Sequence, residues 1–88
     1  MHKALITFSS NKTLELCEGQ LVTLISKFID SNEKVSASPS ETYELWNHSS
    51  AGMIPSVCEF LCRCDFFHLI DDDNKVYNSK AVVTIQNI

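Results

Sequence analysis

The sequence predicts one α+β domain in which an N-terminal β-hairpin and a third strand pack against helices. Three observations predict this class: two short strand-like runs before residue 18, an apolar run with helical spacing at residues 20–29, and a proline-initiated apolar run from residue 55. With 88 residues, 44% of them hydrophobic, and only two glycines and two prolines, the chain suits a single domain spanning residues 1–88.

The first element expected is a β-hairpin. Residues 4–8, "ALITF", are apolar and β-branched, and residues 14–17, "LELC", alternate between apolar and polar side chains. The polar cluster "SSNKT" between the two runs suits a turn. The two runs are therefore predicted to pair as antiparallel strands.

Residues 20–29, "QLVTLISKFI", are predicted to form an amphipathic helix. The i, i+3, i+4, i+7 spacing that defines an apolar helical stripe is occupied by Leu21, Leu24, Ile25 and Phe28. The following segment, residues 30–41, has no apolar period and is interpreted as a loop, although Ser38 and Glu41 also fit a helix capping box. Residues 42–46 then alternate as in a short strand, with Trp46 packing at its end.

The run "IPSVCEFLCRC" predicts a helix with Pro55 in its first turn, where a missing N–H is no loss. Glu59 and Arg63, one turn apart, mark its solvent side. The opposite half is apolar and is formed by Val57, Phe60, Leu61, Cys64 and Phe67. This helix is expected to be central to the fold.

The cysteines of this segment are predicted to be reduced thiols in an apolar interior. On one continuous helix, Cys64 and His68 would point about 200° away from Cys62, so Cys58, Cys62, Cys64 and His68 could not converge on a single ion. We expect no bound metal and no cofactor. Nor do we expect catalysis, because no glycine-rich phosphate loop or nucleophile motif is present and Arg63 alone is weak support for an activated thiol.

The charge distribution narrows the class of partner. From residue 41 onward seven acidic residues face three basic ones, so the second half carries the whole net charge of −4. A phosphate backbone would be repelled by that half, which disfavours nucleic acid and favours a protein with a basic surface. Since no apolar run approaches the roughly 20 residues that span a bilayer and no signal-peptide pattern is present, an intracellular location, cytoplasm or nucleus, is expected.

The chain resembles the BTB/POZ fold, and within it the Elongin C and Skp-type adaptors of ubiquitin ligases, in the order of its segments. That order is "ALITFSSNKTLELCEGQ", then a helix, a polar loop and "ETYELWNHSSAGMIPSVCEFLCRCDFF". In the later helix the family shows Val-Cys followed by an aromatic residue, a bulky residue and a more distant aromatic residue. The residues that match this pattern are Val57, Cys58, Phe60, Leu61 and Phe67. The resemblance covers residues 4–70. The connection "CEGQ" is shorter than in the family, and "VYNSKAVVTIQNI" replaces a longer loop and terminal helix; its β-branched residues favour a strand over helical turns.

The resemblance implies a protein–protein adaptor that receives an amphipathic helix of a receptor, or a second adaptor subunit, in an apolar groove. It assigns partner binding to Phe60, Phe67, Tyr77 and Val82, with ordinary core packing as the alternative role. Self-association of the chain is a further option.

Two other classes of function remain as alternatives. One is a winged-helix regulatory protein, in which residues 42–46 would be helical. The other is a small acidic inhibitor of the phage type that binds a basic protein surface.

Overall fold

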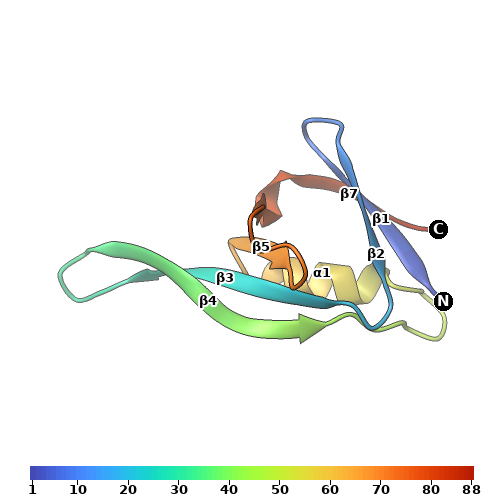
Figure 1. Cartoon of the computed structure of the whole chain (residues 1–88), viewed down its shortest axis with the longest axis horizontal. Helices are drawn as coiled ribbons and strands as arrows, with labels where there is room; N and C mark the ends of the chain where they lie inside the picture. Colours follow the sequence, from blue (N-terminus) through green and yellow to red (C-terminus); the bar gives the residue numbers. More distant parts are fainter.

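The computed structural model describes all residues, 1–88, and shows a small α+β domain of two antiparallel sheets and one α-helix (Figure 1). This confirms the predicted fold class at that level. The elements in chain order are β1 (Lys3–Phe8), β2 (Thr13–Cys17), β3 (Leu21–Ile29), β4 (Val35–Glu44), α1 (Ile54–Cys62), β5 (Phe66–Leu69), β6 (Tyr77–Asn78), the 3-10 turn η1 (Ser79–Ala81) and β7 (Val82–Asn87).

The first sheet has the strand order β2-β1-β7. The predicted hairpin is confirmed, since β1 pairs antiparallel with β2, and Leu5 lies opposite Glu15. On its other side Leu5 lies opposite Gln86 in β7, so the C-terminal segment is the strand that its β-branched residues favoured. The first and last strands of the chain are thus direct neighbours.

The second sheet has the order β4-β3-β5-β6, and here the helix predicted at residues 20–29 is wrong. These residues form the central strand β3, in which Val22 and Leu24 are fully buried while the alternate residues Thr23 and Ile25 are partly exposed. An apolar-rich run can satisfy both a 3.6-residue and a two-residue period. The strand is favoured because β3 gains backbone partners on both sides, from β4 and from β5.

The loop predicted at residues 30–41 is also wrong for most of its length, because β4 begins at Val35. A tight turn joins β3 to β4, with the Asp30 carboxylate accepting the backbone N–H groups of Asn32 and Lys34, each at 2.9 Å. The strand predicted at residues 42–46 is confirmed up to Glu44. A winged-helix arrangement needs helices at residues 20–29 and 42–46, but residues 21–29 and 42–44 are in strands and no helix forms at 45–46.

Helix α1 agrees with the prediction at its start, with Pro55 in the first turn, but it ends at Cys62. Phe67, predicted on the same helix, lies in β5. The chain leaves the helix at Cys64 and Asp65, whose carbonyl oxygens lie 2.8 and 3.0 Å from the buried Ser79 hydroxyl. This hydrogen bonding anchors the turn between α1 and β5.

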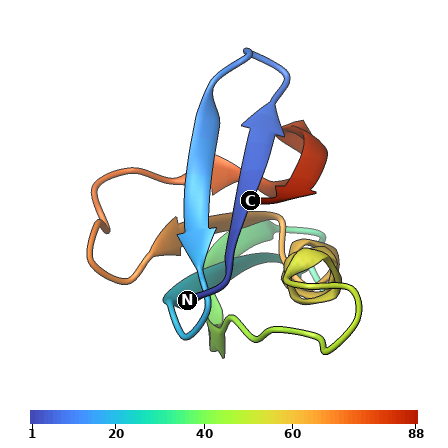
Figure 2. The same cartoon turned by 90° about the vertical axis from the view of Figure 1, so that its right-hand side faces the viewer.

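One hydrophobic core lies between the two sheets and is closed by α1, which Figure 2 shows end-on beside the strands. Its members come from both sheets and the helix: Ala4, Ile6, Phe8, Leu16, Val22, Leu24, Tyr43, Leu45, Met53, Val57, Phe60, Cys64 and Phe67. The chain passes from one sheet to the other at Gly19, whose φ of 84° suits glycine. Both sheets therefore depend on the same interior.

Candidate functional site

The four predicted partner-binding residues occupy two different environments. Phe60 and Phe67 are 0% exposed and pack edge-to-face with ring centroids 5.1 Å apart, so the structure gives them the alternative role of core packing. Tyr77 and Val82 are partly buried and pack against the core from outside. The four side chains do not line a common groove, and only Tyr77 borders an open pocket.

Tyr77 belongs to a stack of three aromatic rings. Its ring centroid lies 5.1 Å from that of Phe8 and 5.3 Å from that of Phe67, with interplanar angles of 12° and 23°. Because Phe8 and Phe67 are held in the core, they fix the orientation of the Tyr77 ring. The phenol is thereby held at the surface in one position.

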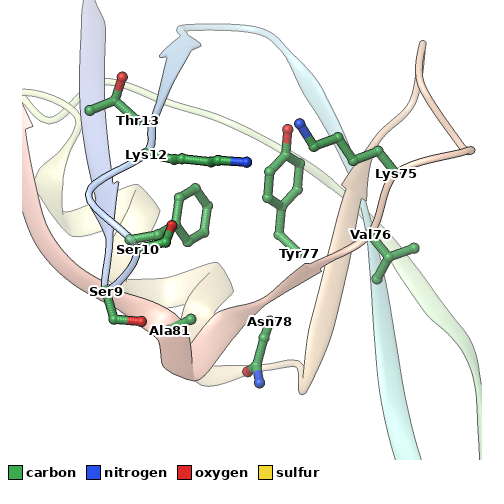
Figure 3. Close-up of a pocket in the computed structure, with 10 residues that line it drawn as sticks. Ser9, Ser10, Lys12, Thr13, Lys75, Val76, Tyr77, Asn78 and Ala81 are labelled. Atoms are coloured by element: carbon green, nitrogen blue, oxygen red, sulfur yellow. The ribbon is translucent and has the colours of Figure 1, made fainter.

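The Tyr77 pocket has a volume of about 310 Å³ and lies between the β1–β2 turn and the segment around β6 (Figure 3). Its lining residues are Phe8, Ser9, Ser10, Lys12, Thr13, Lys75, Val76, Tyr77, Asn78 and Ala81. Hydroxyl, amide and ammonium groups thus surround a partly apolar floor. Such a mixture is typical of sites for small polar ligands.

Two lysines enter the Tyr77 pocket from opposite walls. Figure 3 shows the ammonium groups of Lys12 and Lys75 both directed toward the Tyr77 hydroxyl, and the Lys75 Nζ lies 5.5 Å from the Tyr77 ring centroid. The molecule's three ion pairs use Lys3 and Arg63 as cations, so neither pocket lysine has a carboxylate partner. None of the acidic residues lines the pocket, although the chain as a whole is acidic.

A second candidate is the arm, which we define as residues 26–38, the distal part of the β3–β4 hairpin. Figure 1 shows the arm projecting away from the rest of the molecule, whose longest dimension is 45 Å against 26 and 23 Å for the others. The exposed fractions of Phe28, Ile29 and Val35 are 48%, 64% and 60%. The arm thus carries large apolar side chains that no other element covers.

Strand register places much of this apolar surface on one side. Ile29 and Val35 lie directly opposite each other, so their side chains share a face, whereas Phe28 points to the other face. The same alternation adds the neighbouring apolar residues of β3, β4 and β5, and we define the outer face as Ile25, Ile29, Val35, Ala37, Pro39 and Phe66. Lys27 lies within it and takes part in no ion pair.

The cysteine-rich segment is only partly interior, so the prediction is wrong for two of its three thiols. Cys58 and Cys62 are exposed on α1, whereas Cys64 is buried and its Sγ lies 3.3 Å from the Phe60 carbonyl oxygen. Burial raises the pKa of the Cys64 thiol to about 11, which makes it a poor nucleophile. No three His, Cys, Asp or Glu side chains are placed to share a metal ion.

A polar network joins β4 to α1. The Trp46 indole N–H donates to the Tyr43 hydroxyl oxygen at 2.7 Å, and that hydroxyl donates to Glu59 Oε1 at 2.8 Å. The hydrogen bond from Tyr43, aided by the nearby Arg63 guanidinium, lowers the pKa of Glu59, whereas burial raises the pKa of Tyr43. Tyr43 therefore stays protonated near neutral pH, and the network serves to hold β4 and α1 together.

Neither the arm nor the Tyr77 pocket was predicted from the sequence. The arm was hidden by the helical period of residues 20–29, although the β-branched residues of that run were a signal for a strand. The pocket joins the β1–β2 turn to residues some 60 positions later, and no local pattern could reveal that.

Comparisons of the chain with protein-family models, with curated proteins and with solved structures give no match. The single α-helix has nine residues, and the structure holds no helix of the length and apolar character needed to cross a membrane.

Proposed function

We propose that the protein is a non-catalytic binding module that docks on another protein through the outer face of its second sheet. The observation that carries this proposal is the exposed pair Ile29 and Val35 on a projecting arm. Apolar side chains that adjoin one another on a surface, unlike scattered single ones, mark sites of protein interaction.

The arm contributes little to the interior, since none of the core residues comes from residues 26–38. Its contacts with the rest of the molecule are polar ones near its base, where the Ser26 hydroxyl donates to the Arg63 carbonyl oxygen and the Lys27 N–H donates to the Asp65 carboxylate. Covering the outer face would remove apolar area from water at about 25 cal/mol per Å². The arm therefore adds little to the stability of the isolated domain, and its apolar surface is available to stabilise a complex with a partner.

The partner that fits this face is a different protein rather than a second copy. Pro39 and the bulge where β3 and β4 shift register interrupt the free edge of β4, which hinders strand-to-strand pairing between copies. The outer face as defined contains Lys27 but no carboxylate, so a second copy meeting it face to face would supply no opposite charge for Lys27. We infer a partner with an apolar patch that includes a carboxylate to meet Lys27.

The finer form of the proposal is an Elongin C-like adaptor of the BTB/POZ type, which bridges a substrate receptor to a ubiquitin ligase-type complex. Its support is the sequence resemblance centred on Val57, Cys58 and Phe60. Because Phe60 and Phe67 are fully buried, the receptor's amphipathic helix would in this case bind the outer face and not a groove lined by these two residues. In the alternative, an acidic inhibitor of a basic protein, binding would depend on charge and would weaken steeply with added salt.

The test uses a photoreactive amino acid placed at position 35 or, as the control, at position 83, in the full chain expressed in its native cell. Val35 and Val83 are matched, being 60% and 61% exposed valines in different sheets. A discrete heterologous adduct from position 35 and none from position 83 is expected. Equal adducts from both positions, or only a homodimer adduct, would overturn the proposal.

Binding of the partner so identified is then measured with purified proteins. Val35→Ser is expected to weaken it about tenfold or more, whereas Val83→Ser leaves it unchanged, and both variants keep the melting temperature within a few degrees. An unaltered affinity for Val35→Ser would remove the arm from the interface.

A further inference from the structure

We propose that the Tyr77 pocket binds a small organic phosphate, a phosphomonoester with an apolar or aromatic substituent. This site lies in a different part of the molecule from the outer face, and its occupation does not require the function proposed above.

The charge arrangement of the pocket calls for an anion. Lys12 and Lys75 direct their ammonium groups into the same pocket from opposite walls, and no carboxylate lines it (Figure 3). The contrast with the rest of an acidic chain is marked, since acidic residues outnumber basic ones eleven to seven. An anion bound in this pocket would gain charge-assisted interactions with two ammonium groups that have no other partner.

The number of cations indicates which anion fits best. A phosphomonoester carries a charge of about −1.5 to −2 near pH 7, whereas a carboxylate carries −1. Two ammonium groups therefore match the phosphate more closely. The Tyr77 hydroxyl points between the two ammonium groups and can donate to the same anion (Figure 3), and Ser9, Ser10 and Thr13 make the adjoining lining polar.

The Tyr77 hydroxyl is held in place before any ligand arrives. Its ring is stacked on Phe8 and Phe67, which are 7% and 0% exposed, so the phenol cannot swing away without disturbing the core. A donor fixed in this way loses little conformational entropy when it binds a ligand.

The rest of the pocket indicates what the phosphate is attached to. Phe8, Val76 and Ala81 supply apolar lining, and the volume of about 310 Å³ exceeds what a bare phosphate ion fills. Pockets of this size lie at the lower end of the range, about 300–1,000 Å³, used for small organic ligands. A compact apolar or aromatic substituent on the phosphate would occupy the remaining space.

The probe for the test is phenyl phosphate, titrated into the full chain by calorimetry or by NMR, with inorganic phosphate and benzoate as comparisons. Phenyl phosphate is expected to bind with a dissociation constant below about 1 mM and more tightly than either comparison. If inorganic phosphate bound as tightly as phenyl phosphate, the pocket would hold an adventitious ion only, and the proposed organic substituent would have no role. Tighter binding of benzoate, or no binding of phenyl phosphate, would also overturn the proposal.

Three lysine variants locate the site. Lys12→Gln and Lys75→Gln are each expected to weaken phenyl phosphate binding about tenfold, because each removes one charged hydrogen-bond donor. The control is Lys34→Gln, which neutralises a lysine that is exposed on the arm and takes part in no ion pair. An equal loss of phenyl phosphate affinity in all three variants would mean that only the net charge of the protein matters, and it would contradict a specific site at the Tyr77 pocket.

Tyr77→Phe completes the test, since it keeps the aromatic stack and removes only the hydroxyl. It is expected to weaken phenyl phosphate binding several-fold while the thermal melt stays close to that of the natural chain. Val35→Ser should leave phenyl phosphate binding unchanged, so failure of either proposal can be recognised separately.

Discussion

At the scale of single residues, the contact between Gly52 and Asn87 joins two distant parts of the chain. Asn87 Oδ1 accepts the backbone N–H of Met53 at 2.9 Å, and Asn87 Nδ2 donates to the Ala51 carbonyl oxygen at 3.0 Å. A Cβ on Gly52 would lie 2.5 Å from Asn87 Oδ1, so only glycine leaves room for this side chain. The end of β7 is thereby fixed to the start of α1.

The two glycines of the chain therefore differ in what they tolerate. Gly19→Ala is expected to cost about 1 kcal/mol in free energy of unfolding, because its positive φ is strained for alanine but the space around it is open. Gly52→Ala adds a steric clash to a similar backbone strain and is expected to cost about 2 kcal/mol or more. Urea unfolding of both variants measures the difference, and equal losses would contradict the role given to Asn87.

At the scale of elements, the link between β4 and α1 depends on an ionised carboxylate. Glu59 accepts the Tyr43 hydroxyl, and its Oε1 lies 3.8 Å from an Arg63 guanidinium nitrogen. Arg63 also lies 5.8 Å from the centroid of the Tyr43 ring, so the three side chains form one cluster. The cluster loses its charge pairing when Glu59 is protonated.

This linkage has a definite pH dependence. The folded-state pKa of Glu59 is below its ordinary value of 4.5, so its stabilising effect is present above that pH and is lost as the pH falls through the lowered pKa. Glu59→Gln is therefore expected to be less stable than the natural chain at pH 6, with a gap that narrows by about pH 3. Urea unfolding across this range measures the gap.

The control for this experiment is Glu44→Gln, since Glu44 forms no ion pair and no side-chain hydrogen bond. It is expected to follow the wild-type curve. A gap for Glu59→Gln that stays constant from pH 6 to pH 3 would mean that the carboxylate's charge does not contribute.

At the scale of the whole molecule, both sheets share one interior, with Phe60 at a central position. Its ring centroid lies 5.8 Å from that of Tyr43 in β4 and 5.1 Å from that of Phe67 in β5, and the same core includes Ile6 of the first sheet. Unfolding should consequently be a single cooperative transition.

Phe60→Ala is expected to reduce the free energy of unfolding by about 3–5 kcal/mol, because it leaves a large cavity at a fully buried position. Val83→Ala, at a 61% exposed position, should change it by less than about 0.5 kcal/mol. Circular dichroism reports on the backbone of the whole domain, and Trp46 fluorescence reports on the junction between the end of β4 and α1. Their midpoints should shift together in Phe60→Ala, and separate midpoints would contradict the single core.

The parts of the fold that sequence patterns predicted correctly are those where one period dominates. The β1–β2 hairpin has alternating strands and a polar turn, and α1 has a proline start with Glu59 and Arg63 on its wet side. Residues 21–29 fit two periods at once, and the choice between helix and strand is made by β4 and β5, which lie elsewhere in the chain. Local pattern alone could not decide it.

The candidate sites are harder to predict than the fold for a related reason. Phe60 and Phe67 were predicted to bind a partner, with core packing as the alternative, and sequence spacing does not tell whether such apolar residues face a core or a partner. Tyr77 was identified, whereas Lys12 was not, because the two meet only when the first hairpin packs beside the β6 segment. Sites built from distant segments require the tertiary structure.

The pairing of β1 with β7 has a consequence for biosynthesis. Residues 3–8 can pair with β2 early, but their second partner, residues 82–87, is synthesised much later, so the first sheet is completed late in the folding of this domain. The β3–β4 hairpin, whose partners are close in sequence, can form earlier. Until residues 82–87 are available, the side of β1 that later pairs with β7 is an unpaired strand edge, open to pairing with another chain.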